Sequence, residues 1–298
     1  MNRSLRPSAW GFVLYLLPGL LIYSFVVLLP IVDAFRYSLY AWTGGPRMRF
    51  IALENYGRLL HDELFWYSFW NNLVIIAIAL IGQVGFAIVF SLLLHSRSTK
   101  FKGLHRTMSY FPSTLSAIVV AMLWSLLYNY NHGLINAILR SIGLDRWALP
   151  WLDMPGPILL TATAPLIWQA IGGYAIIILA GYTSINKEVL EMAEIDGASG
   201  IKRAMHITLP LLKNTLMVCV VLCIAANMRG FDHFYALTGG GPGNSSLVVA
   251  LYAYNTSFTR FNYGYGSAIS IGIMILSLAL IVGSRILLLG NWRKKKEA

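Results

Sequence analysis

The residue types that perform catalysis or hold metals are few in this sequence, and none of them forms a recognisable catalytic set. Cys219 and Cys223 lie four residues apart in an apolar run without a nearby histidine or carboxylate, so they share one helix face. Two thiolates are too few for a structural zinc site, and residues four apart on a helix are poorly placed for a disulfide. We interpret both cysteines as packing residues and predict no metal site.

A glycine-rich segment at residues 238–243, Thr-Gly-Gly-Gly-Pro-Gly, is predicted to form a loop because this composition disfavours a helix. The segment lacks the Lys-Ser/Thr pair that ends a Walker phosphate-binding loop, so it is not an ATP site. The sequence also contains no metalloprotease His-Glu pair and no nucleophile elbow. These observations predict that the chain is not an enzyme.

The overall composition is that of a membrane protein. Hydrophobic residues make up 57% of the 298 residues and charged residues only 12%, about half of the roughly 25% found in soluble proteins. The mean hydropathy is +0.64. Such a composition excludes a soluble globular enzyme, a disordered tail and a fibrous repeat.

Apolar segments of about 20 residues, the length that crosses a bilayer core, predict an all-α polytopic membrane protein with six transmembrane helices. The first is predicted to be retained, because it is too long for a signal peptide and no small-residue cleavage site follows it. The six predicted helices are Ala9–Val32, Leu73–Leu94, Tyr110–Tyr128, a segment within Met154–Asn186, Leu209–Met228 and Phe261–Leu289.

Lysine and arginine predict the orientation, because these residues accumulate in cytoplasmic loops. With the N-terminus inside, 14 of them fall on the cytoplasmic side, including all eight lysines, and 7 fall outside. Both termini are therefore predicted to be cytoplasmic, and the net charge of +11 needs no nucleic acid to explain it. The chain is predicted to divide into three parts. Residues 1–70 contain the first helix and an outer loop with an aromatic stretch at residues 65–67, residues 71–290 form the transmembrane domain, and residues 291–298 form a basic tail.

One cytoplasmic loop, residues 186–210, has more structure in its sequence than a simple connector needs. Residues 186–196 predict a short helix with Val189, Met192 and Ala193 on an apolar face, and Gly197 is predicted to end it by adopting φ > 0. Ser199 is predicted to cap a second short helix that runs through His206. The first helix carries four of the chain's twelve acidic residues, which anionic lipid would repel, so a protein partner is the better explanation. The four are Glu188, Glu191, Glu194 and Asp196.

The same loop carries a resemblance to a known family. Residues 191–198, Glu-Met-Ala-Glu-Ile-Asp-Gly-Ala, followed by Ile-Thr-Leu-Pro at 207–210, resemble the EAA motif of binding-protein-dependent ABC importer permeases. Two positions depart from the family pattern, since Met192 replaces an alanine and Ala204 stands where an aromatic residue is common. Residues 50–56, 151–153 and 237–242 resemble the sugar- and glycerol-phosphate-importing, maltose-type branch, so that the resemblance covers nearly the whole chain.

The resemblance implies a permease domain in a bacterial or archaeal cell (inner) membrane that hydrolyses no ATP itself and has no cofactor of its own. The expected partners are a second homologous permease, two ABC ATPase subunits that hold ATP and magnesium, an extracytoplasmic solute-binding protein, membrane lipid and a sugar. Loop 186–210 is then the coupling helix. The residues expected to serve the ATPase contact are Glu191, Ala193, Asp196, Gly197, Ala198, Leu209 and Pro210.

Polar and aromatic residues of the fourth and fifth helices are candidates for the solute path, because polar groups are costly within membrane spans. Trp168, Gln169 and Tyr174 combine aromatic rings with hydrogen-bonding groups, and Asn227 falls in the outer half of the bilayer core. The resemblance places Gln169, Gly173, Asn227 and Gly230 at or near the sugar-binding positions of maltose-type relatives. In the alternative interpretation, Gln169 and Asn227 bond to neighbouring helices instead.

Two other functions remain as alternatives at the level of sequence. An ion-coupled secondary transporter would usually place carboxylates in the middle of the membrane, whereas the interiors of the predicted helices contain no Asp or Glu. An ABC importer of a non-sugar solute, such as glycerol-3-phosphate, would share the motif and the predicted topology.

Overall fold

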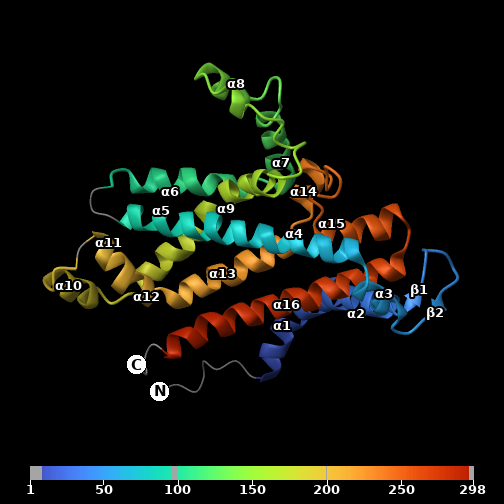
Figure 1. The fold of residues 1–298 in the computed structure, drawn as a ribbon. Helices are drawn as coiled ribbons and strands as arrows, with labels where there is room; N and C mark the ends of the chain where they lie inside the picture. The colour runs from blue at the N-terminus through green and yellow to red at the C-terminus, as the bar shows by residue number, and fades with distance from the viewer. Residues whose placement is uncertain (1–8, 96–98, 199, 295–298) are drawn as a thin grey trace. The chain divides into compact units, whose positions relative to one another are not determined.

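The computed structural model describes residues 9–95, 99–198 and 200–294, which form two compact units (Figure 1). The smaller unit comprises residues up to 62 together with 253–272, and the larger unit comprises residues 63–252 together with those from 273 onward. Most described residues are helical, as the sequence predicts, and the single sheet among them is the two-residue pair of β1 (Tyr40–Ala41) and β2 (Arg49–Phe50).

The smaller unit combines the N-terminal helix with a short segment that contains the two strands. Its elements are α1 (Ala9–Tyr23), the π-helical segment η2 (Ser24–Leu28), α2 (Leu29–Ser38), β1, β2, α3 (Glu54–Leu60), η7 (Asn255–Thr259) and the start of α16 (Tyr263–Lys294). The buried side chain of Asn55 holds the turn after α2 by donating to the carbonyl oxygens of Ser38 and Tyr40, at 2.8 and 3.0 Å. Farther along α3, the Arg58 guanidinium lies 4.1 Å from the centre of the Tyr265 ring, a cation–π contact to the first turn of α16.

The larger unit is a helical bundle that contains the loop 186–210. Its first elements are α4 (Glu63–Ala79), η3 (Leu80–Gly85), α5 (Phe86–His95), α6 (Lys102–Tyr110), η4 (Phe111–Thr114), α7 (Ala117–Leu127), α8 (Leu134–Ser141), η5 (Asp145–Trp147) and α9 (Ile158–Thr183). The remainder are α10 (Lys187–Ile195), α11 (Gly200–Arg203), η6 (Ala204–Thr208), α12 (Leu209–Leu211), α13 (Lys213–Met228), α14 (Asp232–Leu237) and α15 (Val249–Tyr254), which crosses into the smaller unit.

Six predicted spans correspond to four continuous apolar helices and two bent helix pairs. The continuous helices, each long and apolar enough to cross a membrane, are Val13–Ser38, Glu63–His95, Ile158–Thr183 and Tyr263–Leu287. The bent pairs are Lys102–Thr114 with Ala117–Leu127, at 99°, and Gly200–Leu211 with Lys213–Met228, at 74°. Counting each pair as one span confirms the predicted number of six.

Several predicted boundaries were wrong. The second helix begins at Glu63, so the aromatic stretch 65–67, which was predicted to lie in an outer loop, is its first turn, and Phe65 is fully buried there. The third span is bent because Pro112 lies in a short 3₁₀ turn, after which the Ser116 hydroxyl accepts from the Val119 N–H and starts α7 anew. The first helix continues past Val32 to Ser38, and α16 continues to Lys294; residues 295–298 of the predicted tail lie outside the described residues.

Helix α9 lies at the centre of the larger unit and contacts α4, η3, α5, α6, η4, α7 and α13. Pro165 within α9 cannot donate to the carbonyl of Thr161, and the Tyr128 hydroxyl donates to that oxygen instead, at 2.9 Å. Bilayer interiors offer no water for such a group, so this contact removes a large desolvation cost. Cys219 and Cys223 of α13 are free and fully buried in the core between α13, α9 and α4–α5, which confirms that they are packing residues.

A glycine allows helices α6 and α9 to come into close backbone contact. A Cβ atom on Gly172 of α9 would lie 2.0 Å from the backbone oxygen of Ser109 in α6, whereas one on the adjacent Gly173 would meet nothing within 4 Å. The contact of α6 with α9 therefore requires glycine at position 172 and not at position 173.

We expect Gly172→Ala to destabilise the protein by about 1–3 kcal/mol, because a backbone oxygen cannot move aside as a side chain can. The measurement is the midpoint of thermal unfolding of the purified chain in detergent. Gly173→Ala is the matched control and should leave the midpoint unchanged. Equal midpoints for the two variants would contradict the α6–α9 contact.

Candidate functional site

The loop 186–210 forms a small helical projection at one end of α5, α9 and α13 (Figure 1). Its first helix, α10, is capped by Asn186, whose side-chain oxygen accepts from the N–H of Glu188 at 3.0 Å. The segment beyond it stays helical through Leu211, past the predicted end at His206, because η6 and α12 continue α11 without a break. Ser199, the predicted cap of the second helix, lies outside the described residues.

Gly197 ends α10, as the sequence predicts, and the hydrogen bonds explain why glycine is needed. Gly197 has φ = +79°, its N–H donates to the carbonyl of Glu194 at 3.2 Å, and the N–H of Ala198 donates to the carbonyl of Ala193 at 2.9 Å. These two bonds form a Schellman motif, in which the residue after the helix must be left-handed. Because a Cβ atom at Gly197 would meet nothing within 4 Å, the requirement comes from the backbone and not from packing.

The projection is held to the bundle by buried contacts and stiffened by an ion pair. Ala193 is only 6% exposed, so the motif alanine packs inward, and Leu212 at the start of α13 is fully buried. The hydroxyls of Thr208 and Tyr182 form a side-chain hydrogen bond between η6 and α9. Arg203 pairs with Glu194 at 3.5 Å and ties α11 to α10.

The outer surface of the projection combines exposed apolar and acidic side chains. Met192, predicted on the packed apolar face, is exposed, as are Ile195 and Ile201. Glu191 and Asp196 are exposed too, while Leu209 and Pro210 are half-buried where η6 joins α12. Apolar side chains rimmed by carboxylates are typical of a protein-binding surface.

The predicted solute-path residues fall into two groups. The first group lies where α9 passes the bend between η4 and α7. The Gln169 side chain donates to the carbonyl of Leu115 at 2.8 Å. The Trp168 ring packs edge-on against the Trp124 ring, with the two ring centres 6.1 Å apart. Trp168 keeps 37% of its surface exposed, and Gly173 borders open space. Gln169 therefore bonds to the bend between two neighbouring helices, a contact of the kind that the alternative interpretation of this residue describes.

The second group lies inside the bundle, around an amide that the sequence analysis did not select. Asn227 is 4% exposed, and its side-chain nitrogen donates to the carbonyl of Cys223 at 2.8 Å and faces the Gln83 oxygen at 3.5 Å. The Cys223 thiol donates to the same Gln83 oxygen, and Tyr174, itself 8% exposed, hydrogen bonds to Cys223. Gln83 is the only amide of the predicted span Leu73–Leu94, and that isolation was the signal in the sequence.

A second missed pair of amides fixes the segment after the glycine-rich loop. Asn72 donates to the carbonyl of Asn227 at 3.1 Å and accepts from the N–H of Val249 at 2.9 Å, while Asn71 donates to the carbonyl of Leu247 at 3.0 Å. Residues 238–243 form the predicted loop, with positive φ at three of the four glycines, and Gly230 is half-buried at the end of α13. The polar groups of α4 therefore connect α13 to α15.

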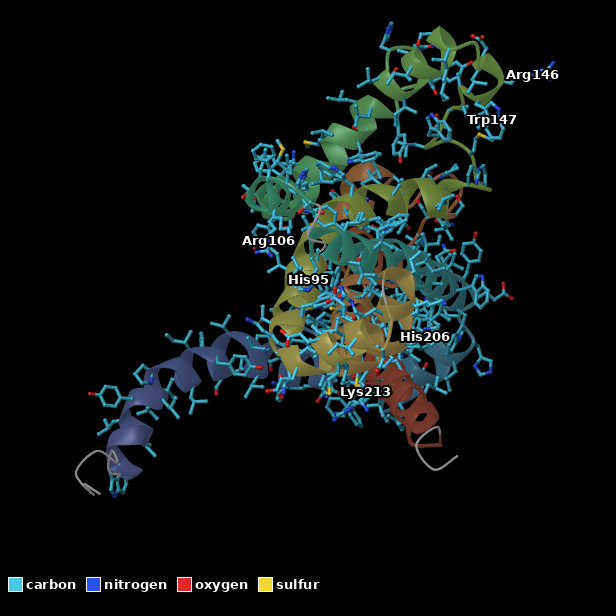
Figure 2. The ribbon with its side chains drawn as sticks, turned by 90° about the vertical axis from the view of Figure 1, so that its left-hand side faces the viewer. His95, Arg106, Arg146, Trp147, His206 and Lys213 are labelled. Atoms are coloured by element: carbon cyan, nitrogen blue, oxygen red, sulfur yellow. The ribbon has the colours of Figure 1, made fainter. Side chains whose placement is uncertain are left out.

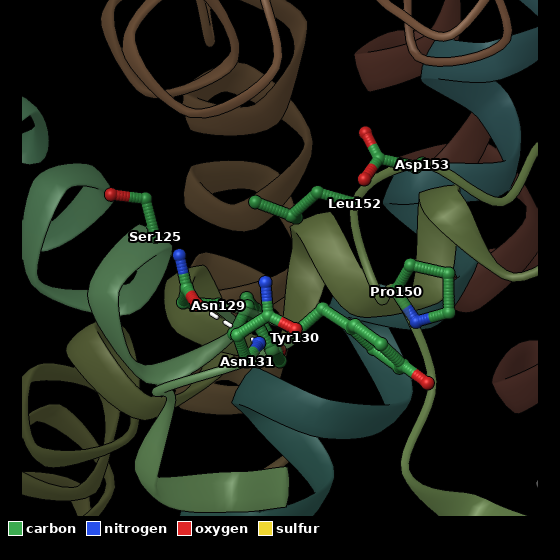
Figure 3. A pocket seen from close by; sticks show the side chains of 8 residues that line it. Ser125, Asn129, Tyr130, Asn131, Pro150, Leu152 and Asp153 are labelled. Atoms are coloured by element: carbon green, nitrogen blue, oxygen red, sulfur yellow. Dashed lines mark hydrogen bonds between the residues drawn. The ribbon is translucent and has the colours of Figure 1, made fainter.

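A polar hollow of about 270 Å³ opens at the far end of α7 and was not predicted (Figure 3). Its lining comprises Ser125, Tyr128, Asn129, Tyr130, Asn131, Pro150, Leu152 and Asp153. The Asn129 oxygen accepts from the N–H groups of Asn131 and His132 and thereby shapes the floor of the turn. None of the predicted solute-path residues lines this hollow.

His233 of α14 is a buried structural residue. Its Nε2–H donates to the carbonyl of Ala162 in α9 at 2.8 Å, which anchors α14. Burial lowers the pKa of His233, so the ring is neutral near pH 7 and serves as a hydrogen-bond donor without charge.

Comparison with known proteins identifies the family of this chain. Residues 87–290 match the family described as the binding-protein-dependent transport system inner membrane component, and the chain belongs to this family. It is 34% identical to the probable ABC transporter permease protein YurN of Bacillus subtilis, over 90% of this chain and 92% of the relative. It is also 34% identical to the trehalose/maltose transport system permease protein MalF of Thermococcus litoralis, over 93% and 92%.

A solved structure shares the fold. A chain of a bacterial ABC transporter involved in the import of the acidic polysaccharide alginate superposes with a TM-score of 0.80, at 23% identity, over 94% of this chain and 95% of that chain. The expected membrane permease class and the helical fold are thereby confirmed.

The buried amide network predicts the effect of changing Asn227. We expect Asn227→Ala to lower stability by about 1–3 kcal/mol, because it removes the donor to the Cys223 carbonyl and leaves Gln83 without one of its partners. The measurement is thermal unfolding of the purified chain in detergent. Asn131→Ala, at an exposed asparagine, is the control and should have no effect.

The outcome for Asn227 also separates its two interpretations. A lower unfolding midpoint supports a residue that holds helices together. An unchanged midpoint together with reduced solute uptake would contradict this role and assign Asn227 to the solute path.

Proposed function

We propose that this chain is one of two permease subunits of an ATP-driven importer, and that the imported solute is a sugar delivered by an extracytoplasmic solute-binding protein. The observation that carries the proposal is the 34% identity, over 93% of the chain, with a permease named for trehalose and maltose transport. Relatives named for multiple sugar-binding transport and for lactose transport, each 28% identical, support a saccharide over glycerol-3-phosphate. Membership of a binding-protein-dependent family disfavours an ion-coupled secondary transporter.

In this proposal the projection 186–210 docks on a separate ABC ATPase subunit, which supplies ATP and magnesium. The exposed Glu191 and Asp196 meet basic groups of the ATPase, and Met192 and Ile195 enter its groove. The Schellman turn at Gly197 and the Glu194–Arg203 pair make the two arms of the projection one rigid body. A rigid element transmits the movement of the ATPase to α9 and α13, which the projection joins directly.

The proposed orientation places both termini and the projection in the cytoplasm. Within the larger unit, the projection lies at the same end as the start of α6, since Lys102, Arg106 and Arg203 all act electrostatically on His95. This is the end that carries the lysine-rich loops, which supports the cytoplasmic assignment. The candidate solute-path residues Gln169, Gly173 and Tyr174 of α9 then lie between this end and the outer face.

We expect Gly197→Val to leave membrane insertion intact but to abolish most sugar uptake and reduce co-purification of the ATPase subunits. A β-branched residue is strained at φ = +79°, by roughly 1–3 kcal/mol, so the second arm would turn away from its native direction. The measurement is uptake of radiolabelled maltose, trehalose or lactose by the assembled importer. Gly197→Asn is the matched control, since asparagine tolerates the left-handed conformation, and should retain most activity.

Each result bears on a different part of the proposal. Wild-type uptake by Gly197→Val would show that the loop is only a connector. If the wild-type importer binds its ATPases but takes up none of the tested sugars, the sugar assignment is wrong. The permease function would then still stand.

The orientation has its own test. Single cysteines placed at Lys202 and at Asn244, in a chain with Cys219 and Cys223 replaced by alanine, are treated with a membrane-impermeant maleimide in intact cells. Both positions are exposed, so differences in labelling report the side of the membrane. We expect labelling at 244 only; labelling at 202 from outside would reverse the topology.

A further inference from the structure

The projection 186–210 is joined to the bundle at two interruptions of the helical backbone. On one side, residues 184–186 separate α9 from α10, and on the other side Leu212 separates α12 from α13. At the second interruption, the segments Gly200–Leu211 and Lys213–Met228 meet at 74°. Because regular helix is interrupted at both connections, the direction of the projection depends on side-chain contacts as well as on the backbone.

The last turn of α9 contacts both sides of this bend. A Cβ atom on Gly181 would lie 2.5 Å from the Thr215 hydroxyl and 3.0 Å from the Leu212 side chain, so α9 lies directly against the start of α13. The hydroxyl of Tyr182, the next residue, bonds to the hydroxyl of Thr208, which lies before the bend and is 1% exposed. The backbone oxygen of Thr208 accepts from the Leu212 N–H at 2.9 Å. Adjacent residues of α9 therefore hold the two segments that meet at the bend.

The Tyr182 hydroxyl differs from those of the two residues that follow it. The Thr183 hydroxyl donates to the carbonyl of Ala180 at 2.7 Å, and the Ser184 hydroxyl donates to the carbonyl of Gly181 at 2.6 Å, so both bond back to their own helix. Within the described part of the chain, Tyr182 alone of the three bonds to another element. Its bond to η6 is therefore a contact between elements and not a cap of α9.

The ring of Tyr182 reaches a third element. It stacks on the ring of His95, the last residue of α5, with the ring centres 4.2 Å apart and 23° between the planes. Figure 2 views the larger unit from this end, with His95 labelled. Tyr182 is only 7% exposed, so its ring is enclosed between its neighbours. One side chain of α9 thus contacts both α5 and η6, although the chain does not connect α5 to the projection directly.

We propose that Tyr182 is a positioning residue for energy coupling, which holds the projection at its angle to α13 and ties it to α5. The inference rests on the proposed function, in which a separate ATPase moves the projection. With the hydroxyl bond in place, movement of the projection carries α5, α9 and α13 with it. Without the bond, the two interruptions of the helix would take up part of the movement, and ATP would be hydrolysed with less transport.

The test measures sugar uptake and ATP hydrolysis by the complete importer in liposomes, with its second permease, ATPase subunits and binding protein. The measured quantity is the number of radiolabelled sugar molecules imported per ATP hydrolysed, with whichever of maltose, trehalose and lactose the wild type imports. We expect Tyr182→Phe to lower this ratio by about two- to tenfold, the factor that corresponds to one hydrogen bond, while hydrolysis continues. Thr183→Val is the matched control, since it removes a neighbouring hydroxyl that bonds to its own helix, and should leave the ratio unchanged.

Variants of the two partners test the contacts themselves. Thr208→Val should lower the ratio as much as Tyr182→Phe does, and Thr208→Ser, which keeps a hydroxyl, should preserve it. The double variant Tyr182→Phe/Thr208→Val should be no worse than either single variant, because both changes remove the same bond. His95→Ala should lower the ratio too, whereas His95→Phe, which can still stack on Tyr182, should preserve it.

An unchanged ratio in Tyr182→Phe beside a transporting wild type would overturn the inference. A proportional fall in uptake and hydrolysis would also overturn it, because a purely structural role lowers both and leaves their ratio unchanged. So would an equal loss from Thr183→Val. Failure of the proposed function appears in the wild type instead: a wild type that binds no ATPase subunits would contradict both that function and the role of Tyr182.

Discussion

The close approach of α6 to α9 at Gly172 is the constraint on which the larger unit depends. A bilayer offers little hydrophobic driving force between helices, so their association relies on close packing and on hydrogen bonds. Gly172 lets the α6 backbone come into contact with α9, and Gly181 does the same for the side chains of Thr215 and Leu212 near the start of α13. With α9 held on both sides, the bend after η4 and the projection after Thr183 acquire defined positions.

Hydrogen bonding in this unit reflects the cost of leaving a buried polar group without a partner in a membrane, although the buried Nε1 of Trp124 has no partner among the described residues. The Tyr128 hydroxyl serves the carbonyl that Pro165 leaves free, and Gln83 collects donors from Cys223 and Asn227. These contacts join the end of α7 to α9 and η3 to α13 at a small number of points. Tyr174, Cys223 and Gln83 thereby connect α9, α13 and η3 inside the bundle.

Charged side chains gather at one end of the larger unit, on the projection and on α6. Four acidic residues lie on α10 or directly after it, together with Lys187, while Lys102 and Arg106 lie on α6. The Glu194–Arg203 pair is the one described ion pair that joins acidic and basic residues here.

The sequence by itself determined the class of the protein, the number of spans and the turn at Gly197, because apolar length and a left-handed glycine are local properties. It also carried the motif that led to the permease family. Only the tertiary structure decided that the third and fifth spans are bent, that the helix of Glu63 begins before the predicted boundary, and that Gln169 and Asn227 bond to other parts of the bundle. The partner of Gln83, Cys223, became visible only when α13 was placed against it, because a hydrogen bond between residues 140 positions apart leaves no periodic trace in the sequence.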